Sequence, residues 1–593
     1  MKKYSNYKSN YDKYPVVQVS ETSENVCWQG WPEIVSQLNK SLENVHKPVK
    51  VLVVECYQGV YDEEVKSALK GQLPHTLWLD ASSAMKTSEE INSFLKSDIT
   101  DDEIFGYMTR YHMDCYFDEK KIAELREKVA GISAGVVIVY GVGAAYVMPE
   151  SDVLVYADMA RWEIQMRFRR NEISNVGVDN RMERASLQYK RGFFVDWRIC
   201  DRFKKTLMSK WDYVLDTNVM GDPKMATAAI VDAGLKKASK SPFRVVPFFD
   251  PGPWGGQWMK EICDLDRETP NFAWCFDCVP EENSLYLGFG EVRFEIPSID
   301  LVFSYPRELL GNPVYGRFGD EFPIRFDFLD TMGGGNLSLQ VHPVTQYIRD
   351  TFGIYYTQDE SYYLLDAEED ATVYLGLKTG VNPDEMIAAL NESQQTGKPF
   401  DTEKYVNKWP AKRHDHYLIP AGTVHCSGAG AMVLEISATP SIFTFKLWDW
   451  GRLGLDGLPR PINIGHGSKV IQWERQTEFV RHNLINQVEM IAEGDGWREE
   501  RTGLHENEFI ETRRHWFTDI VPHNTNGGVQ VLNVIKGDEL IVESPTNAFE
   551  PFIVHYAETF IIPACVGEYT IRPYGSSVGK YCGTIKAYVR FRQ

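Results

Sequence analysis

Short apolar runs alternate with helix-patterned stretches between residues 47 and 216. The runs are KPVKVLVVECY, HTLWLDAS, GVVIVYGVGAAYV, SDVLVYADM and WDYVLDTN, and helical stretches such as VYDEEVKSALKGQL lie between them. Several runs end in aspartate, at Asp80, Asp158 and Asp216. Buried strands that alternate with helices are typical of a parallel, doubly wound α/β sheet. The pattern therefore predicts such a domain over residues 31–240, with any ligand beyond the carboxyl ends of its strands. The polar residues 1–30 before it are predicted to form a tail.

The pattern changes at residues 238–256, which are rich in proline and glycine. Short aromatic and β-branched runs with Pro/Gly turns follow, including NSLYLGF, VRFEIPS, IRFDFLD and SYYLLDA, and a second group begins with HWFTDIV and VQVLNVIKGDELIVES. This spacing predicts β-barrels or sandwiches. We expect one such domain over residues 241–465 and another over 466–593. The stretch PDEMIAALNESQQ predicts a helix within a small insertion at about 380–410.

The α/β region has arginines on the helix after one of its strands, at Arg161, Arg167, Arg169 and Arg170. That segment is weakly similar to the arginine-bearing lid of nucleoside and nucleotide kinases. A phosphate-binding loop needs the pattern Gly-x-x-x-x-Gly-Lys-Ser/Thr, whereas the first strand here leads into ECYQGVY. We therefore predict a kinase-like domain that lacks a P-loop and serves packing, anion binding or regulation. Surface ion pairs are an equally good explanation of the arginines.

Four residues in the first β-rich region are candidates to bind a metal. Gln340 and His342 lie two apart on a predicted strand, so they leave the same face of the sheet. Glu360 begins the next strand pattern, and His425 follows the turn Pro-Ala-Gly at the start of another. Nitrogen and oxygen donors without a thiolate suit Zn²⁺ or another borderline divalent ion. Each residue alone is better explained as part of the core, but together they predict a metal site.

The motifs LSLQVHP, PAGTVH, MVLEIS and WDWGR occur in this order, with the metal-candidate glutamate between the first two. This region resembles the metal-binding cupin of type I mannose-6-phosphate isomerases (phosphomannose isomerases). The resemblance begins near PWGG at residues 253–256 and runs to the C-terminus. It implies two jelly-roll cupins, and the second is expected to be metal-free because its Pro563-Ala564 turn lacks the following histidine.

The resemblance implies a metal-dependent aldose–ketose isomerase that interconverts mannose 6-phosphate and fructose 6-phosphate. Its metal ligands would be the four residues above. Ser338 and the inward-pointing Glu435 would line the site or handle the proton, and Lys446 and Arg452 would bind the phosphate of the sugar-phosphate partner.

Three departures from the resembled family bear on turnover. Lys446 stands where arginine is usual, neutral Gln358 stands where a lysine precedes the metal glutamate by two residues, and His414 replaces a glycine. A lysine keeps the charge of arginine but loses its two-pronged geometry. A cupin that binds metal and sugar phosphate without isomerising it, with a regulatory α/β domain, is therefore the alternative hypothesis. A bifunctional kinase-isomerase is disfavoured by the missing phosphate loop.

The formal charge of −20 over 593 residues disfavours nucleic acid and anionic membranes as partners. No signal peptide or membrane span is evident, so we expect a cytoplasmic protein. Ten scattered cysteines are typical of reduced, packed thiols. The pair Cys275 and Cys278 lacks a second pair at zinc-finger spacing.

Overall fold

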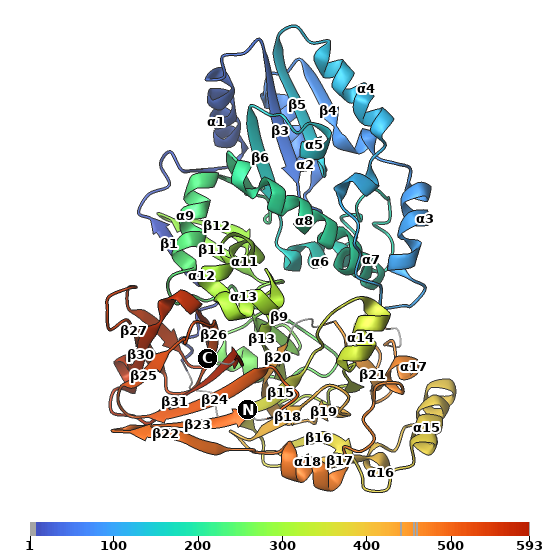
Figure 1. Ribbon diagram of the computed structural model, residues 1–593, viewed down its shortest axis with the longest axis vertical. Coiled ribbons are helices and arrows are strands. Elements are labelled where there is room, and N and C mark those ends of the chain that lie inside the picture. Colours follow the sequence, from blue (N-terminus) through green and yellow to red (C-terminus); the bar gives the residue numbers. More distant parts are fainter. Residues whose placement is uncertain (1–7, 439–441, 455–456, 458–459, 504, 592–593) are drawn as a thin grey trace. The chain divides into compact units, whose positions relative to one another are not determined.

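The computed structural model describes residues 8–438, 442–454, 457, 460–503 and 505–591, so the first seven residues of the predicted tail lie outside it (Figure 1). The chain divides into two compact units. Unit 2 comprises Val16–Lys237 and Ser284–Ser304, and unit 1 comprises the remainder. None of the helices among the described residues is long and apolar enough to cross a membrane.

Unit 2 is built on a seven-stranded mixed sheet (Figure 1). Five consecutive strands that reach one edge of the sheet are parallel, and antiparallel pairing adds the two strands at the other edge. Their order is β2 (Cys27–Gln29), β8 (Lys224–Thr227), β7 (Tyr213–Asp216), β6 (Val153–Asp158), β3 (Val49–Cys56), β5 (Gly135–Gly141) and β4 (Leu77–Asp80). The central strand β3 is apolar on both faces, with Leu52, Val53 and Val54 buried, as a sheet covered by helices on both sides requires.

The helices of this sheet occur between its strands along the chain. They are α1 (Trp31–Glu43), α2 (Asp62–Gln72), α3 (Ser88–Ile99), α4 (Glu119–Ala130), α5 (Ala144–Val147), α6 (Arg161–Arg169), α7 (Ala185–Arg191), α8 (Trp197–Leu207) and α9 (Ala228–Ala238). A small second sheet of unit 2 joins β1 (Val16–Ser20), β11 (Ser284–Phe289) and β12 (Val292–Pro297), followed by α11 (Ile299–Ser304). The segment 284–304 therefore returns to the α/β unit after the chain has entered unit 1.

The first barrel of unit 1 packs two antiparallel sheets. The larger has the order β18 (His416–Ile419), β15 (Glu360–Ala367), β20 (Ala431–Ala438), β13 (Ile324–Asp330), β10 (Trp274–Cys278) and β9 (Phe248–Asp250). The smaller has the order β17 (Val406–Pro410), β16 (Thr372–Leu377), β19 (His425–Ser427), β14 (Leu339–Val341) and β21 (Phe445–Trp448).

The second barrel of unit 1 repeats this plan. Its larger sheet has the order β22 (Glu489–Gly494), β23 (Trp497–Gly503), β24 (Ile510–Phe517), β31 (Cys582–Val589), β26 (Gln530–Lys536) and β29 (Thr559–Ile562). The smaller has the order β25 (Val521–Asn524), β30 (Glu568–Pro573), β27 (Glu539–Glu543) and β28 (Phe552–His555). These sheets confirm the predicted fold class, an α/β domain followed by two cupin barrels.

The helices of unit 1 are short. They are α10 (Trp258–Ile262), α12 (Pro306–Leu310), α13 (Asn312–Phe318), α14 (Thr345–Phe352), α15 (Pro383–Thr396), α16 (Thr402–Tyr405), α17 (Ile464–Gly467) and α18 (Thr477–Asn483). Helix α15 is the predicted insertion helix. It begins at Pro383 after Asn382, whose side chain accepts a hydrogen bond from the Glu385 backbone N–H (3.1 Å), and it ends before Gly397 in the left-handed region (φ 73°).

Two of the four arginines on and just after α6 make contacts inside unit 2. Arg161 is buried against Asp201, and Arg167 is fully buried and donates to the backbone carbonyls of Gly59 and Thr217, each at 2.7 Å. Buried guanidinium groups that donate to carbonyl and carboxylate oxygens of the protein hold loops in place, and those donors are not available to a ligand. Of the alternatives raised from the sequence, internal packing is the one these two contacts support.

Candidate metal centre

The two sheets of the first barrel bring three predicted ligands together. Gln340 on β14 lies directly opposite His425 at the start of β19, in the smaller sheet. Glu360 is the first residue of β15, in the larger sheet. His425 Nε2 lies 2.8 Å from Glu360 Oε1, and His342 Nε2 lies 3.0 Å from Glu360 Oε2. The carboxylate is therefore placed between two imidazoles that reach it from the facing sheet.

This His-Glu-His group is closed off from solvent. His342, Glu360 and His425 are each at most 1% exposed, and one ligand atom of each lies within 4.8 Å of the others. His342 Nε2 and Glu360 Oε1 are buried without a hydrogen bond of acceptable geometry among the described residues. Their short separations combined with missing hydrogen bonds indicate that the lone pairs converge on a shared point. Such a point is where a metal ion would lie.

A contact between Nδ1 of each imidazole and a backbone carbonyl oxygen determines which ring nitrogen faces the His-Glu-His group. His342 Nδ1 lies 2.9 Å from the carbonyl oxygen of Phe443, and His425 Nδ1 lies 2.8 Å from that of Thr423. Each ring therefore carries its proton on Nδ1 and presents Nε2 as a ligand, as metal-bound histidines usually do. The turn before His425 depends on Gly422, whose φ of 89° disfavours a side chain and whose N–H donates to the carbonyl of His342.

The fourth predicted ligand, Gln340, is adjacent. Its side-chain amide lies 3.3 Å from His425 Nε2, and Gln340 is buried. Gln358, which stands at the expected lysine position, donates from Nε2 to Glu360 Oε2 over 3.0 Å. The donor set of two imidazoles, one carboxylate and one amide fits Zn²⁺ or another borderline divalent ion.

Charge at the centre favours an ionised carboxylate. Burial would raise the pKa of Glu360, but the imidazoles of His342 and His425 outweigh it and hold that pKa well below its usual value. Glu435 behaves in the opposite way, because burial and the nearby charge of Glu360 raise its pKa well above the ordinary value. The pKa values of these two neighbouring carboxyl groups are therefore shifted in opposite directions, downward for Glu360 and upward for Glu435.

The inner face of the larger sheet carries two rows of polar side chains. Directly opposite residues on neighbouring antiparallel strands share a face, and so do residues two apart on one strand. By register the rows are Glu360, Ser437 and Arg325, and Tyr362, Glu435 and Asp327. All six are buried. Glu435 thus lies on the same face as the metal-candidate glutamate, as its sequence position predicted.

Sequence reasoning missed three members of these rows, Arg325, Asp327 and Tyr362. Arg325 and Asp327 form a buried ion pair. Burial raises the pKa of Asp327 to about 7, although Arg325 opposes the shift. The signal was present in IRFDFLD, where an arginine and an aspartate alternate with apolar residues in an otherwise core-like strand.

The remaining predicted site residues lie in β21 or just outside the ends of β14 and β21. Lys446 is the register partner of Gln340, and burial, followed by the charge of Arg460, lowers its pKa to about 8. Ser338 donates to Asp449 (2.8 Å), and Arg452 pairs with the same carboxylate (2.6 Å). Arg460 also pairs with Asp449, at 3.0 Å. Asp449 and Arg460 were not predicted, although Asp449 lies within WDWGR.

Two further sequence features have structural roles. His414, with φ of 72°, lies 3.0 Å by its Nδ1 from the Tyr363 hydroxyl. Cys275 and Cys278 are buried on β10, and burial raises the pKa of both thiols well above the usual value. Buried, neutral thiols are inert core residues.

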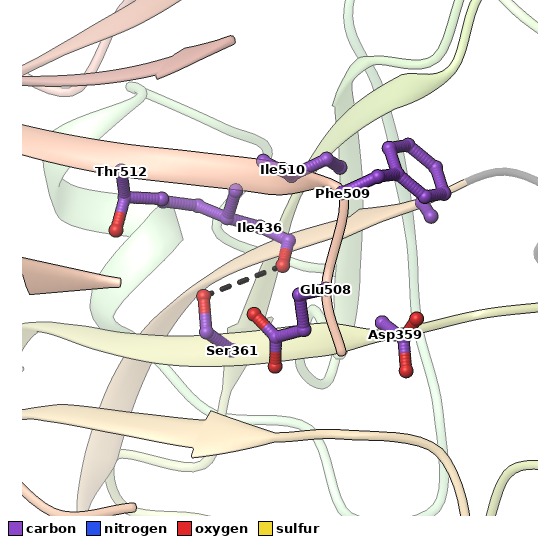
Figure 2. Close-up of a pocket in the computed structure, with 8 residues that line it drawn as sticks. Asp359, Ser361, Ile436, Glu508, Phe509, Ile510 and Thr512 are labelled. Carbon is purple, nitrogen blue, oxygen red and sulfur yellow. Dashed lines mark hydrogen bonds between the residues drawn. The ribbon is translucent and has the colours of Figure 1, made fainter. Parts of the chain in front are cut away.

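A small cavity of about 10 Å³ lies beside β15, on the side to which Ser361 points (Figure 2). It has room for about one water molecule. Figure 2 shows Ser361 and Glu508 directed into this space from different segments. Burial, and then the charge of Asp359, raise the pKa of Glu508 well above its usual value. Because Ser361 and Glu360 alternate on the strand, this cavity lies on the opposite face from the His-Glu-His group.

Unit 2 contains a larger cavity of about 850 Å³ at the carboxyl ends of β3, β4 and β5. Its lining includes Asp62, whose carboxylate accepts a hydrogen bond from Tyr140 (2.8 Å), and Lys66, which pairs with Asp80 (3.1 Å). The location agrees with the expectation for a doubly wound sheet.

Comparisons with known proteins find one family model and several relatives that match part of the chain. Residues 30–240 match the model of a family described as a domain of unknown function, DUF8485. YvyI of Bacillus subtilis, which carries the provisional name of a mannose-6-phosphate isomerase, is 23% identical over 347 residues, covering 56% of this chain and 96% of that protein. The mannose-6-phosphate isomerase of Streptococcus mutans is 28% identical over 227 residues, covering 37% of this chain and 64% of that protein.

Among solved structures, the mannose 6-phosphate isomerase of Bacillus subtilis aligns with a TM-score of 0.47 at 20% identity. The alignment covers 59% of this chain and all of that structure. Part of this chain is therefore distantly related to mannose-6-phosphate isomerases.

Proposed function

We propose that this protein is a metal-dependent aldose–ketose isomerase that interconverts mannose 6-phosphate and fructose 6-phosphate. The observation that carries the proposal is the buried convergence of His342, Glu360 and His425 on one point, with Gln340 beside it. The relatives named as mannose-6-phosphate isomerases supply the substrate class. The reaction moves one proton between C1 and C2 of the sugar through an enediol, so it needs proton-handling groups and charge stabilisation.

Gln340, His342, Glu360 and His425 would hold the ion, and Zn²⁺ fits their donor types. A divalent ion bound there supplies positive charge that polarises the oxygen atoms on C1 and C2. The backbone carbonyls behind the two rings keep both Nε2 atoms directed at the ion. Because the two rings are already oriented, they would not have to move when the substrate binds.

The other predicted residues would bind the sugar and its phosphate. Glu435 lies on the same face as Glu360. Burial raises its pKa and so favours the protonated carboxyl, which would donate a hydrogen bond to a sugar oxygen. Lys446, beside Gln340, and Arg452 provide positive charge for the phosphate. Ser338 holds Asp449, which in turn orients Arg452.

A second candidate is a protein that binds metal and sugar phosphate without isomerising the sugar. The observation that favours it is Gln358, a neutral, buried side chain bonded to Glu360. A lysine there, as the resembled family has, would add one positive charge next to the reacting oxygens. Its absence weakens stabilisation of a developing enediolate without disturbing the metal ligands.

The test is coupled detection of fructose 6-phosphate formed from mannose 6-phosphate, together with metal analysis of the same sample. The proposal expects turnover that a chelator abolishes and added Zn²⁺ restores. Bound metal without turnover would instead support the second candidate. Turnover that is indifferent to the chelator, in a protein free of metal, would contradict both.

A further inference from the structure

We propose that the mouth of the second barrel is a binding site for a small anionic metabolite that bears phosphate or carboxylate oxygens. A cavity of about 530 Å³ opens there, the size of a pocket for such a molecule. We call it the second-barrel cavity. Its charged and amide-bearing lining residues are Glu511, Arg513, Asn524, Asn526, Gln530, Lys586 and Arg590.

The strand register places this lining inside the barrel. Arg513 on β24 lies directly opposite Lys586 on β31, and Tyr588, two residues further on, lies opposite Gln530 on β26. These residues therefore share the inner face of three adjacent strands. Further along the same face the side chains are apolar, and Phe517 and Leu532 belong to the core of this barrel. The interior is thus apolar at one end and polar at the end where the cavity opens.

Lys586 is the main argument for an anion. It is only 6% exposed, and its Nζ lies 3.4 Å from His523 Nδ1 and 3.9 Å from Glu499 Oε1. A charge-assisted hydrogen bond is ordinarily about 2.7–2.9 Å long. The buried ammonium group therefore has only one long hydrogen bond and one long ion pair among the described residues. An anionic ligand would give it a closer acceptor.

Arg590 offers a second unsatisfied donor. Its Nε is buried without a hydrogen-bond partner among the described residues, while its Nη2 donates to the carbonyl oxygen of His505 at 2.6 Å. Nη2 also donates to the carbonyl oxygen of Ile510 at 3.5 Å, so the guanidinium is anchored through Nη2 while its Nε–H stays unsatisfied. Asn524, the last residue of β25, and Asn526, in the loop that follows, add exposed amide groups.

The charge balance has the sign that an anion requires. Arg513, Lys586 and Arg590 face one lining carboxylate, Glu511. Glu499, behind the lining, contacts Arg513 at 3.1 Å and reduces the excess to one positive charge.

A metal ion is disfavoured at the same place. His515 and His523 lie close, with ring centroids 4.5 Å apart. The ammonium of Lys586 contacts His523, however, and would repel a cation. Neither histidine lines the cavity, so we assign them no ligand-binding role.

The experiment is calorimetric titration of the full-length protein with inorganic phosphate and, separately, with citrate. We expect Lys586→Met and Arg590→Gln each to weaken binding about 10-fold or more, because a hydrogen bond to a charged group is lost. Lys580→Met is the matched control, since Lys580 is exposed on the same barrel and pairs with Asp538. Its affinity should equal that of the unaltered protein.

Lys446→Met separates this site from the first barrel, where a phosphate could also bind. The proposal expects it to retain the phosphate binding that Lys586→Met loses. Three results would overturn the proposal. The first is binding that is lost only in Lys446→Met, and the second is binding that is unchanged in both cavity variants. The third is no binding of either anion at millimolar concentration. If the protein binds phosphate but not citrate, or citrate but not phosphate, the result identifies which oxyanion the cavity accepts. Because the readout is binding, the result does not depend on turnover.

Discussion

The two barrels of unit 1 have the same plan and opposite interior chemistry. Each pairs a six-stranded antiparallel sheet with a smaller one. In the first barrel the central inward side chain is an anion, Glu360, between two imidazoles. In the second it is a cation, Lys586, close to His523. A few inward positions therefore decide whether a barrel attracts a cation or an anion, while the scaffold is unchanged.

The histidines of the two barrels show the electrostatic side of this difference. Burial would lower the pKa of His342, but the charge of Glu360 raises it above the ordinary value. In the second barrel burial lowers the pKa of His515 to about 4, although Glu499 opposes the shift. The same residue type is thus a metal-ligand candidate next to a buried carboxylate and a neutral core residue near a buried lysine.

The largest expected effect is that of Glu360→Gln in the first barrel. An amide keeps the shape but removes the negative charge between the imidazoles. We expect bound metal to fall to trace amounts and isomerase activity to drop about 10³-fold, because the charge stabilisation supplied by a catalytic ion is worth several kcal/mol. Elemental analysis and the coupled assay measure the two quantities. Glu369→Gln, on an exposed residue just after the same strand, is the control and should change neither. A metal-loaded, active Glu360→Gln variant would refute the assignment.

The next largest effect is a change in stability caused by Lys586→Met in the second barrel. Burial, with a smaller opposing contribution from Glu499, lowers the pKa of Lys586 to about 8 from 10.5. At pH 7 the lysine is charged in both the folded and the unfolded chain, so folding must bury the charge. Removing it should raise the free energy of unfolding by about 3 kcal/mol.

The sign of the pH dependence follows from the lowered pKa. Between about pH 8 and 10.5 the unfolded chain binds more protons at this lysine than the folded one, so stability rises with pH across that window. The advantage of Lys586→Met should therefore shrink from pH 8 and disappear above pH 10.5. Urea denaturation at several pH values measures it, with exposed Lys580→Met as the control. Equal stability of the variant and the unaltered protein at pH 7 would show that the charge is not buried at a cost.

The smallest effect tests whether the apolar half of the second barrel is packed like a core. Ile562 on β29 is fully buried in that cluster. Ile562→Val should lower the free energy of unfolding by about 0.5–1.5 kcal/mol through one lost methylene group. Ile553→Val, at a residue 41% exposed on β28, should change it much less. If the two variants lose the same amount, the interior of this barrel is not close-packed.

Much of the architecture was predictable because strand and helix patterns are local. The α/β domain, both barrels and the insertion helix follow from periodicity and turn residues. The metal candidates were also predictable, because His342, Glu360 and His425 occur at recognisable positions next to turns, and the structure brings them together. The boundaries proposed from composition, with the β-rich part starting at 241, remain a prediction.

What could not be predicted depends on pairing between distant strands. The buried row of Tyr362, Glu435 and Asp327 exists only through the register of β15, β20 and β13. The second-barrel cavity was missed for the same reason, since Arg513 and Lys586 are 73 residues apart and become neighbours only when β24 pairs with β31. The sequence predicts that barrel to be metal-free and structural because no histidine follows its Pro563-Ala564 turn. That expectation says nothing about a buried lysine as an anion ligand.

The return of residues 284–304 to unit 2 has a genetic consequence. Lys204 is buried between Asp158 (2.8 Å) and Asp300 (2.9 Å), and the backbone N–H of Glu295 donates to Asp216 (2.9 Å). A gene fragment that ends at residue 240 would encode the whole matched family region yet omit Asp300 and Glu295. Recombination therefore could not transfer the complete α/β unit as a gene segment that ends at residue 240. Its inheritance is tied to the coding sequence of its neighbour.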